Sequence, residues 1–232
     1  MLRIDTDPST WTIGALEDYI GGQYGQYGLS QPSKMPSYGY SLPASTCKVG
    51  GRLQQQPGTV CSGCYALKGR YVFPGVQAAL WRRFAALDKP LWVEAISELI
   101  NRRAAQGHQY FRWHDSGDLQ SVDHLRMIIA VCELTPGVRH WLPTREYRVV
   151  RDFVADGGNI PANLNIRLSA HKIGGFAPSF PALQGLVTVS TVSPKGDNEH
   201  AHACPAQHQD NSCGSCRACW DRGVDHVDYH LH

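Results

Sequence analysis

Hydrophobic and polar positions form a recurring pattern through the middle of the chain. A short apolar run is followed by a polar turn and then by a stretch with apolar residues at helical spacing. Strands that alternate with helices in this way indicate β-α-β crossovers, which build a parallel sheet. The pattern predicts strands at 109–113, 138–142, 163–169 and 186–191, with helices at 123–134 and 146–156.

Upstream of this region the pattern predicts one more strand and two more helices. Residues 38–42 alternate as in a short strand, and residues 75–106 have the apolar spacing of two consecutive helices. The five predicted strands are too few for a closed eight-stranded barrel. We therefore expect an α/β fold built as an open or partial (β/α) barrel with parallel strands, and a flavodoxin-like sheet is the alternative.

Two segments at the ends of the chain differ from this pattern. Residues 1–37 contain the stretch GGQYGQYGLSQPSKMPS, which is typical of an irregular segment or lid. Residues 200–232 are rich in cysteine and histidine and predict a C-terminal extension that holds a cysteine cluster. The partial barrel itself is expected to occupy residues 38–199.

Composition narrows the class of protein. Hydrophobic residues make up 42% of the chain and charged residues 18%, which is typical of a globular protein rather than a disordered one. The net charge of +2 does not indicate a nucleic-acid partner, although it does not exclude a local basic groove. The chain has no long apolar run and no signal-peptide pattern at its start, so we expect a cytoplasmic protein with no membrane partner.

The eight cysteines are grouped along the chain. A first cysteine group consists of Cys47, Cys61 and Cys64, and a second cysteine group of Cys204, Cys213, Cys216 and Cys219. In a reducing compartment such grouping indicates metal ligation or catalysis rather than disulfides. Cys132 stands apart, on the apolar face of the helix predicted at 123–134, and is expected to be a buried core thiol.

The second cysteine group has the spacing C-x8-C-x2-C-x2-C. The overlapping C-x2-C-x2-C run, with a remote cysteine that precedes Pro205, is typical of a loop around a [4Fe–4S] cluster. Zinc sites more often use two separated C-x2-C pairs, and zinc is the alternative here.

The first cysteine group has the spacing C-x13-C-x2-C and follows the strand at 38–42. Three thiolates leave one iron of a [4Fe–4S] cluster open to a substrate or cosubstrate. A zinc site completed by a histidine is the alternative. A small hairpin between Cys47 and Cys61 is expected, because KVGGRLQQQPGTV is rich in turn residues.

Candidate site residues follow the last four of the five predicted strands. Because active sites in parallel sheets lie beyond the carboxyl ends of the strands, these residues are candidates for a common site. They are His114, Asp115, Ser116, Gly117 and Asp118 after the strand at 109–113, Arg145 and Glu146 after the next, Ser169 and His171 at the end of the third, and Thr191, Ser193, Lys195 and Asp197 around the last.

Three cysteines after the first strand of a partial barrel resemble the radical S-adenosylmethionine (SAM) superfamily. Its members hold the amino and carboxylate groups of SAM on an open iron, and a Gly-Gly-Glu-like motif after the next strand holds the amino group. This chain has Ser116-Gly117-Asp118 at that place, whereas its cysteine spacing differs from the common C-x3-C-x2-C. The resemblance implies a SAM contact for this motif and an adenine contact for Tyr65.

A second resemblance covers the chain from about residue 34 onward. Six segments are similar to the phage "gene product eighty-eight" family, which implies a bacteriophage protein expressed in the host cytoplasm. The segments are KMPSYGYSLPAS, CSGCYALKGRYVFPGVQAAL, FRWHDSGDLQS, WLPTREY, RLSAH and CGSCRACW.

These observations lead to the hypothesis of a radical SAM-type enzyme with two [4Fe–4S] clusters, an electron donor and an unknown substrate, for which a nucleotide or nucleic acid is one candidate class. Alternation along the strand at 163–169 puts Arg167, Ser169 and His171 on one side, toward SAM or substrate. Substrate contact or proton transfer is expected from a further set: His114, Asp115, Arg145 and Glu146.

Two alternatives remain open at this level. One is a SAM-independent iron–sulfur redox protein with the same fold. The other is a zinc-stabilised nucleic-acid-binding protein, for which basic and aromatic residues offer a surface. These residues are Lys68, Arg70, Tyr71, Trp81, Arg82, Arg83, Arg102 and Arg103.

Overall fold

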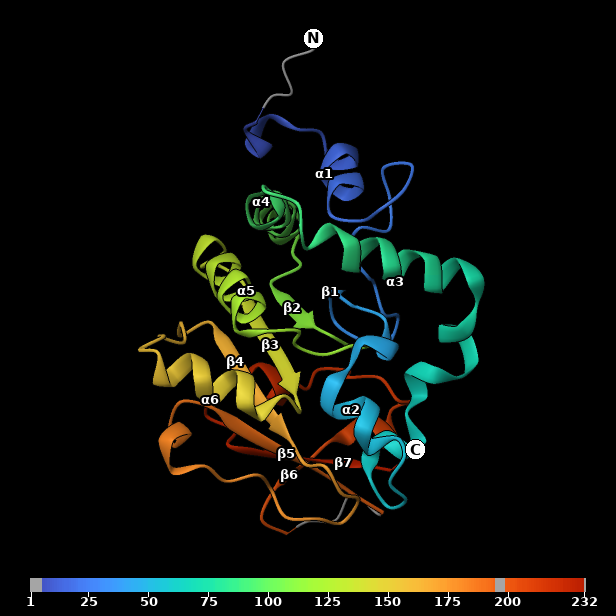
Figure 1. Ribbon diagram of the computed structural model, residues 1–232, viewed down its shortest axis with the longest axis vertical. Coiled ribbons are helices and arrows are strands. Elements are labelled where there is room, and N and C mark those ends of the chain that lie inside the picture. Colours follow the sequence, from blue (N-terminus) through green and yellow to red (C-terminus); the bar gives the residue numbers. More distant parts are fainter. Residues whose placement is uncertain (1–5, 195–198, 232) are drawn as a thin grey trace.

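The computed structural model describes residues 6–194 and 199–231. Within these ranges seven strands form one sheet in which every neighbouring pair is parallel (Figure 1). Its order is β1-β2-β3-β4-β5-β7-β6. The strands are β1 (Tyr38–Tyr40), β2 (Tyr110–Trp113), β3 (Arg139–Thr144), β4 (Leu164–Ser169), β5 (Thr188–Ser193), β6 (His202–Ala203) and β7 (His226–His230).

The first five strands lie side by side in the order of the chain. Each is joined to the next by a crossover, as expected for repeated β-α-β units. The sheet is not closed, because β1 and β6 lie at opposite edges. The predicted α/β fold with parallel strands and a cysteine-rich C-terminal part is confirmed, and the unclosed sheet is compatible with the predicted open or partial (β/α) barrel.

Helices cover one face of the sheet. These are α4 (Trp92–Ala105), α5 (Val122–Leu134) and α6 (Tyr147–Ala155), and each packs against the next. The apolar faces of these helices pack on the strands that they cover and form the core with them. Leu99, Ile128 and Leu164 are fully buried there. Cys132 lies in this core with no exposed surface, so its prediction as a core thiol is confirmed.

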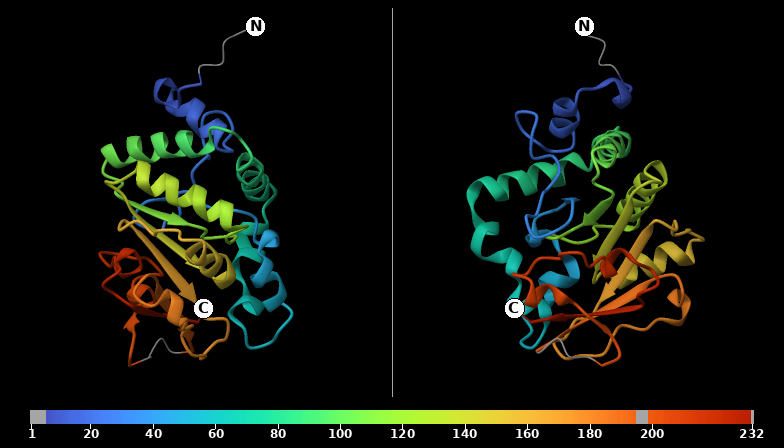
Figure 2. Two further views of the ribbon diagram at one scale, coloured as in Figure 1. Left: turned by 60° about the vertical axis from the view of Figure 1, so that its left-hand side comes forward. Right: turned by 180° about the vertical axis from the view of Figure 1, so that it is seen from behind.

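The C-terminal part of the chain lies on the other face of the sheet. Figures 1 and 2 show this segment in red, opposite the green and yellow helices. Trp220 packs against Tyr110 and Trp141 of β2 and β3, and its indole Nε1 donates to the carbonyl of Phe111 at 2.9 Å. The segment then returns as β7, which lies between β5 and β6. The expected extension is thus built into the sheet itself.

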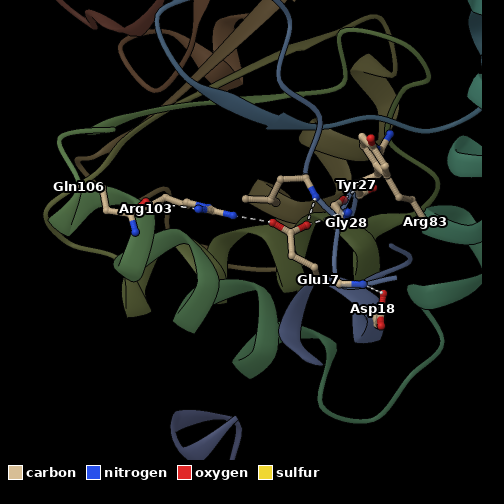
Figure 3. A network of polar contacts seen from close by, with 9 residues as sticks. Glu17, Asp18, Tyr27, Gly28, Arg83, Arg103 and Gln106 are labelled. Atoms are coloured by element: carbon tan, nitrogen blue, oxygen red, sulfur yellow. Dashed lines mark hydrogen bonds and ion pairs between the residues drawn. The ribbon is translucent and has the colours of Figure 1, made fainter. Parts of the chain in front are cut away.

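The N-terminal part contains α1 (Ile13–Tyr19), although the sequence pattern predicts an irregular segment there. Glu17 of α1 is buried and accepts hydrogen bonds from Gly28 N at 2.7 Å and from Leu29 N at 3.0 Å (Figure 3). The same carboxylate forms an ion pair with Arg103 of α4 at 3.0 Å. One buried carboxylate therefore fixes both the helix and the loop that follows it.

Candidate functional site

The first cysteine group lies beyond the carboxyl ends of the strands. Cys47 directly precedes α2 (Lys48–Leu53), and Cys61 lies in the short 3-10 helix η3 (Val60–Gly63). Figure 1 shows α2 beyond the arrowheads of β2 and β3. The hairpin expected between the first two cysteines is wrong, because the chain forms helix α2 there, and the two adjacent glycines concealed that helix in the sequence.

Gly50 of α2 lies against the thiols. A Cβ atom at this position would lie 3.0 Å from Cys47 Cβ, 3.7 Å from Cys47 Sγ and 3.6 Å from Cys61 Sγ. Burial raises the pKa of the Cys47 thiol, and the charges of Asp118, Cys64 and Cys61 raise it further. The three cysteines therefore lie near one another, with the helix backbone close to two of them.

The ends of β3 and β4 hold the first cysteine group in place. Glu146, which follows β3, accepts a hydrogen bond from Val49 N at 2.6 Å, two residues after Cys47. His171, which follows β4, accepts one from Val60 N at 2.9 Å through its backbone carbonyl. The loop is thus fixed on both sides of α2, once beside Cys47 and once beside Cys61.

Asp118 connects the ends of β2 and β3. Its carboxylate accepts hydrogen bonds from Thr144 Oγ1 at 2.6 Å, Leu119 N at 2.8 Å and Arg145 N at 3.0 Å. Burial raises its pKa to about 6, and these hydrogen bonds oppose the rise. All of these partners belong to the protein, so the carboxylate stabilises the junction between the two strands.

The rest of the Ser116-Gly117-Asp118 motif is tightly packed. Gly117 has a φ of +83°, and a Cβ there would lie 2.6 Å from Leu42 Cβ, so only glycine fits this turn. The Ser116 hydroxyl is buried and makes no hydrogen bond among the described residues. Ser116, rather than Asp118, therefore offers a polar atom to a ligand.

Arg145 and His171 lie with the first cysteine group. The Arg145 charge lowers the pKa of the Cys61 thiol, opposing the larger effect of burial. The His171 ring stacks on Tyr147 with 4.5 Å between ring centroids, and its Nε2 is buried without a hydrogen-bond partner among the described residues. The structure thus brings Arg145, Glu146 and His171 to one place, as the strand-end pattern predicts.

Asp115 lies beside two tyrosines. Tyr65 donates from its hydroxyl to the Asp115 carbonyl, and Tyr71 donates to the Asp115 carboxylate at 2.5 Å. Arg112 of β2 interacts electrostatically with both tyrosines and lies over the Trp141 ring, 4.5 Å from its centroid. Sequence reasoning missed Arg112, because nothing in a strand of YFRW shows that its charge faces the C-terminal segment.

His114 lies on the other face of β2. It is buried, its backbone has a φ of 57°, and its ring centroid is 5.3 Å from that of His124 in α5. Burial lowers the pKa of His114 well below the usual range, so the ring is neutral. The structure therefore places His114 among the helices and not with the first cysteine group.

Arg167 points to the C-terminal segment, and Ser169 points to β5. Arg167 is fully buried, and its guanidinium donates to the carbonyls of Val189 at 2.8 Å, Val224 at 3.0 Å and Ala218 at 3.1 Å. Ser169 accepts a hydrogen bond from Ser190 at 3.2 Å. Arg167 is therefore a positioning residue for the loop that holds the second cysteine group.

The second cysteine group lies on that loop. Cys204 interacts electrostatically with Cys213, Cys216 and Cys219, so the four thiols lie near one another. Cys219 Sγ lies 3.1 Å from the Tyr229 hydroxyl of β7, within a cluster that includes Trp141. The two predicted polar residues beyond β5, Lys195 and Asp197, lie outside the described residues.

The fit of each cysteine group to a metal depends on how closely its side chains converge. In the described part of the chain, no three His, Cys, Asp or Glu side chains converge closely enough to hold one ion. Zinc needs its thiolates about 2.3 Å from a single ion, whereas a [4Fe–4S] cluster holds each thiolate on a separate iron. The first cysteine group offers thiols with the Gly50 backbone against two of the sulfurs, whereas in the second the Cys216 sulfur lies 3.6 Å from His202 Nε2.

Comparison of the sequence with known protein families identifies the family of this chain. A family model described as gene product 88 matches residues 17–222. The chain belongs to the gene product 88 family. The matched part of this gene product 88 protein includes both cysteine groups and strands β1 to β6. Comparisons with curated proteins and with solved structures found no match. Among its described residues, this member of the family has no helix with the length and apolar character to cross a membrane.

Proposed function

We propose that this protein is a radical SAM-type iron–sulfur enzyme. The observation that carries the proposal is the position of the first cysteine group, whose three thiols lie beyond the carboxyl ends of sequentially ordered parallel strands. Active sites of parallel α/β sheets occupy this edge. Three thiols without a fourth suit a cluster that keeps one iron accessible.

In this proposal Cys47, Cys61 and Cys64 hold a [4Fe–4S] cluster. When bound together with SAM and supplied with an electron by a donor, the cluster supplies the reductive cleavage of SAM to methionine and a 5′-deoxyadenosyl radical. The protein supplies orientation and exclusion of water. Glu146 and His171 keep the two ends of the cysteine loop on the sheet through Val49 and Val60.

Three groups are available to orient SAM or the substrate. The Ser116 hydroxyl and the His171 Nε2 atom are buried without partners among the described residues, so a polar ligand that bonds to them removes a desolvation cost. Arg145 lies near Cys61 and offers a positive charge to a carboxylate. Tyr65 directly follows Cys64 and presents an exposed aromatic ring for an adenine.

The second cysteine group is proposed to hold a further [4Fe–4S] cluster with four thiolate ligands. A fully ligated cluster has no open iron, so electron relay or structural support suits it better than substrate binding. Trp141 and Trp220 pack beside Cys219 and limit solvent there. Zinc at this group is the alternative cofactor.

The test is anaerobic purification followed by iron, sulfide and zinc analysis. Two clusters give about eight irons per chain, and incubation with dithionite and SAM is expected to release 5′-deoxyadenosine. Cys61→Ala should abolish the release, whereas Ser62→Ala, on the same turn, should retain it. A colourless protein with stoichiometric zinc, or undiminished release from Cys61→Ala, would overturn the proposal.

A SAM-independent iron–sulfur redox protein is the second candidate. One observation favours it, because the Asp118 carboxylate is already occupied by three hydrogen bonds within the protein. It predicts a brown protein that contains both clusters, exchanges electrons with dithionite and releases no 5′-deoxyadenosine.

A further inference from the structure

One long segment of the chain carries positive charge only. Residues 48–87 contain six lysines and arginines and no aspartate or glutamate, whereas the whole chain has 22 basic and 20 acidic residues. The segment contains α2, the short 3-10 helices η3, η4 (Tyr65–Leu67) and η5 (Gly69–Val72), and α3 (Pro74–Ala86). The nearly neutral protein therefore has one long stretch of chain whose own charged side chains are all positive, with the Asp115 carboxylate against Tyr71 as an acidic neighbour from another part of the chain.

Not every basic residue of the sequence hypothesis contributes to this surface. Arg83 is buried and donates to the carbonyls of Tyr27 and Gly28, both at 2.8 Å (Figure 3). Arg102 and Arg103 form ion pairs with Glu98 and Glu17. Lys68 and Arg70 are exposed.

Large aromatic side chains are exposed on the same segment. The exposed fraction is 50% for Tyr65, 57% for Phe73 and 47% for Trp81. In Figure 1 this segment changes from light blue at α2 to teal at α3 and runs along the outer side of the molecule. Exposed rings interleaved with lysine and arginine form the stacking surface that single-stranded nucleic acids bind, because bases stack on the rings and phosphates approach the cations.

The surface leads to the first cysteine group. Tyr65 directly follows Cys64, and Lys48 directly follows Cys47. The Tyr65 hydroxyl donates to the Asp115 carbonyl, which fixes this end of the surface at the edge of the sheet. A single-stranded nucleic acid stacked on Trp81 and Phe73 would therefore be directed along this segment toward Tyr65 and the first cysteine group.

A protein occupant suits this surface less well. A second copy of the chain would bring the same acid-free segment, and like charges would face each other across a symmetric contact. A double-stranded nucleic acid has its bases already stacked and offers no ring faces to Phe73 or Trp81.

We propose that residues 65–81 bind single-stranded nucleic acid and present it to the first cysteine group. The proposed binding is inferred from the exposed aromatic and basic residues alone. The proposal that the bound nucleic acid is a substrate rests on the proposed function.

The experiment uses anaerobically purified full-length protein and a fluorescein-labelled oligothymidylate of about 15 nucleotides, which is long enough for one stacking site. Binding is followed by fluorescence anisotropy over a range of salt concentrations. Trp81→Ala and Phe73→Ala are each expected to weaken binding about tenfold. The double variant Lys68→Glu, Arg70→Glu is expected to reduce the slope of log K against log salt by about 1.4.

The controls lie outside residues 65–81. Phe176→Ala removes an aromatic ring that is 99% exposed, and Arg148→Glu reverses a charge whose side chain is 90% exposed. Both are expected to bind like the wild type, and thermal unfolding followed by circular dichroism checks that every variant is folded.

Several outcomes would overturn the inference. They are absence of binding by the wild type, equal losses in the controls, equally tight binding of a duplex, and self-association that depends on Phe73 and Trp81 without oligonucleotide binding. Cys61→Ala should still bind. Binding without release of 5′-deoxyadenosine contradicts only the proposed function, whereas release without binding contradicts only the inference about this surface.

Discussion

At the scale of single residues, the site depends on the absence of side chains as much as on their presence. Gly50 is buried in α2, and its missing Cβ leaves room beside Cys47 and Cys61. Gly51, the next residue in the same helix, has no atom within 4 Å of its Cβ position. Substitutions at these two glycines therefore separate two effects of an added methyl group, namely contact with the thiols and stabilisation of the helix.

Gly50→Ala is expected to lower the iron content of the purified protein without destabilising its fold. Alanine stabilises a helix interior by about 0.5–1 kcal/mol relative to glycine, but its methyl group would press on Cys47 and Cys61. The measurement is iron per chain together with thermal unfolding.

Gly51→Ala is the matched control. It should retain the wild-type iron content and give the same gain in helix stability. Equal iron in the two variants would show that Gly50 does not shape the first cysteine group.

The sequence identifies the donor residues of the candidate site more readily than their neighbours. Cysteine spacing alone separates the two groups, because each group lies within a short stretch of chain. The hydrogen bond between Glu146 and Val49 joins residues 97 positions apart, and no local pattern reports such a contact. The contacts of Arg167 could not be predicted from the sequence for the same reason, since its acceptors belong to β5 and to the C-terminal loop.

At the scale of elements, the second cysteine group is held by its docking on the sheet. The loop before β7 contacts β4 through Arg167, whose guanidinium bonds to the carbonyls of Ala218 and Val224. Asn165, two residues earlier on the same face, donates to the carbonyl of Cys219 at 2.9 Å. One strand thus orients the loop at several points.

Arg167→Met is expected to destabilise the protein by about 3–5 kcal/mol and to remove iron from the second cysteine group first. The substitution leaves buried carbonyl groups without their donor. Urea unfolding measures the stability, and iron per chain should fall from about eight toward four. Arg167→Lys should show a smaller effect on both, and an unchanged iron content in both variants would contradict this role.

Sequence patterns predict the elements unevenly. The five strands and the helices around them are close to their predicted ranges, because buried parallel strands are short apolar runs and their helices have one apolar face. Strand β7 was not predicted, since HVDYH is mostly polar and its alternation is hidden among histidines. Helix α1 was not predicted for a related reason. Its Glu17 is buried, whereas a glutamate in a sequence pattern normally indicates an exposed position.

At the scale of the whole molecule, the helix-covered face of the sheet contains several buried histidines. Burial lowers the pKa of His124 to about 4 and that of His140 to about 3, and it lowers that of His114 well below its usual range. The neutral ring is favoured in the folded protein. Its contribution to stability is therefore complete above pH 6.5, the ordinary pKa, and is lost as the pH falls below it.

Acidification from pH 6.5 to pH 5 is expected to destabilise the protein. His140 alone contributes a loss of about 2 kcal/mol over this range, because its folded form stays neutral while the unfolded form binds a proton. Asp118 acts in the opposite direction below pH 6, since its raised pKa favours the protonated carboxyl in the fold.

Urea unfolding at the two pH values measures the change. His140→Gln should remove about 2 kcal/mol of the pH dependence, and His208→Gln, an exposed position, should remove none of it. An identical pH dependence in both variants would contradict this assignment.

Strand β7 is synthesised after β6, yet it lies between β6 and β5. In a nascent chain, β6 consequently has no strand to pair with until β7 has left the ribosome. Strands β1 to β4, which hold the first cysteine group, are complete well before that moment. The order of translation therefore lets the first cysteine group assemble on a finished edge, whereas the second is fixed on the sheet only when the final strand joins it.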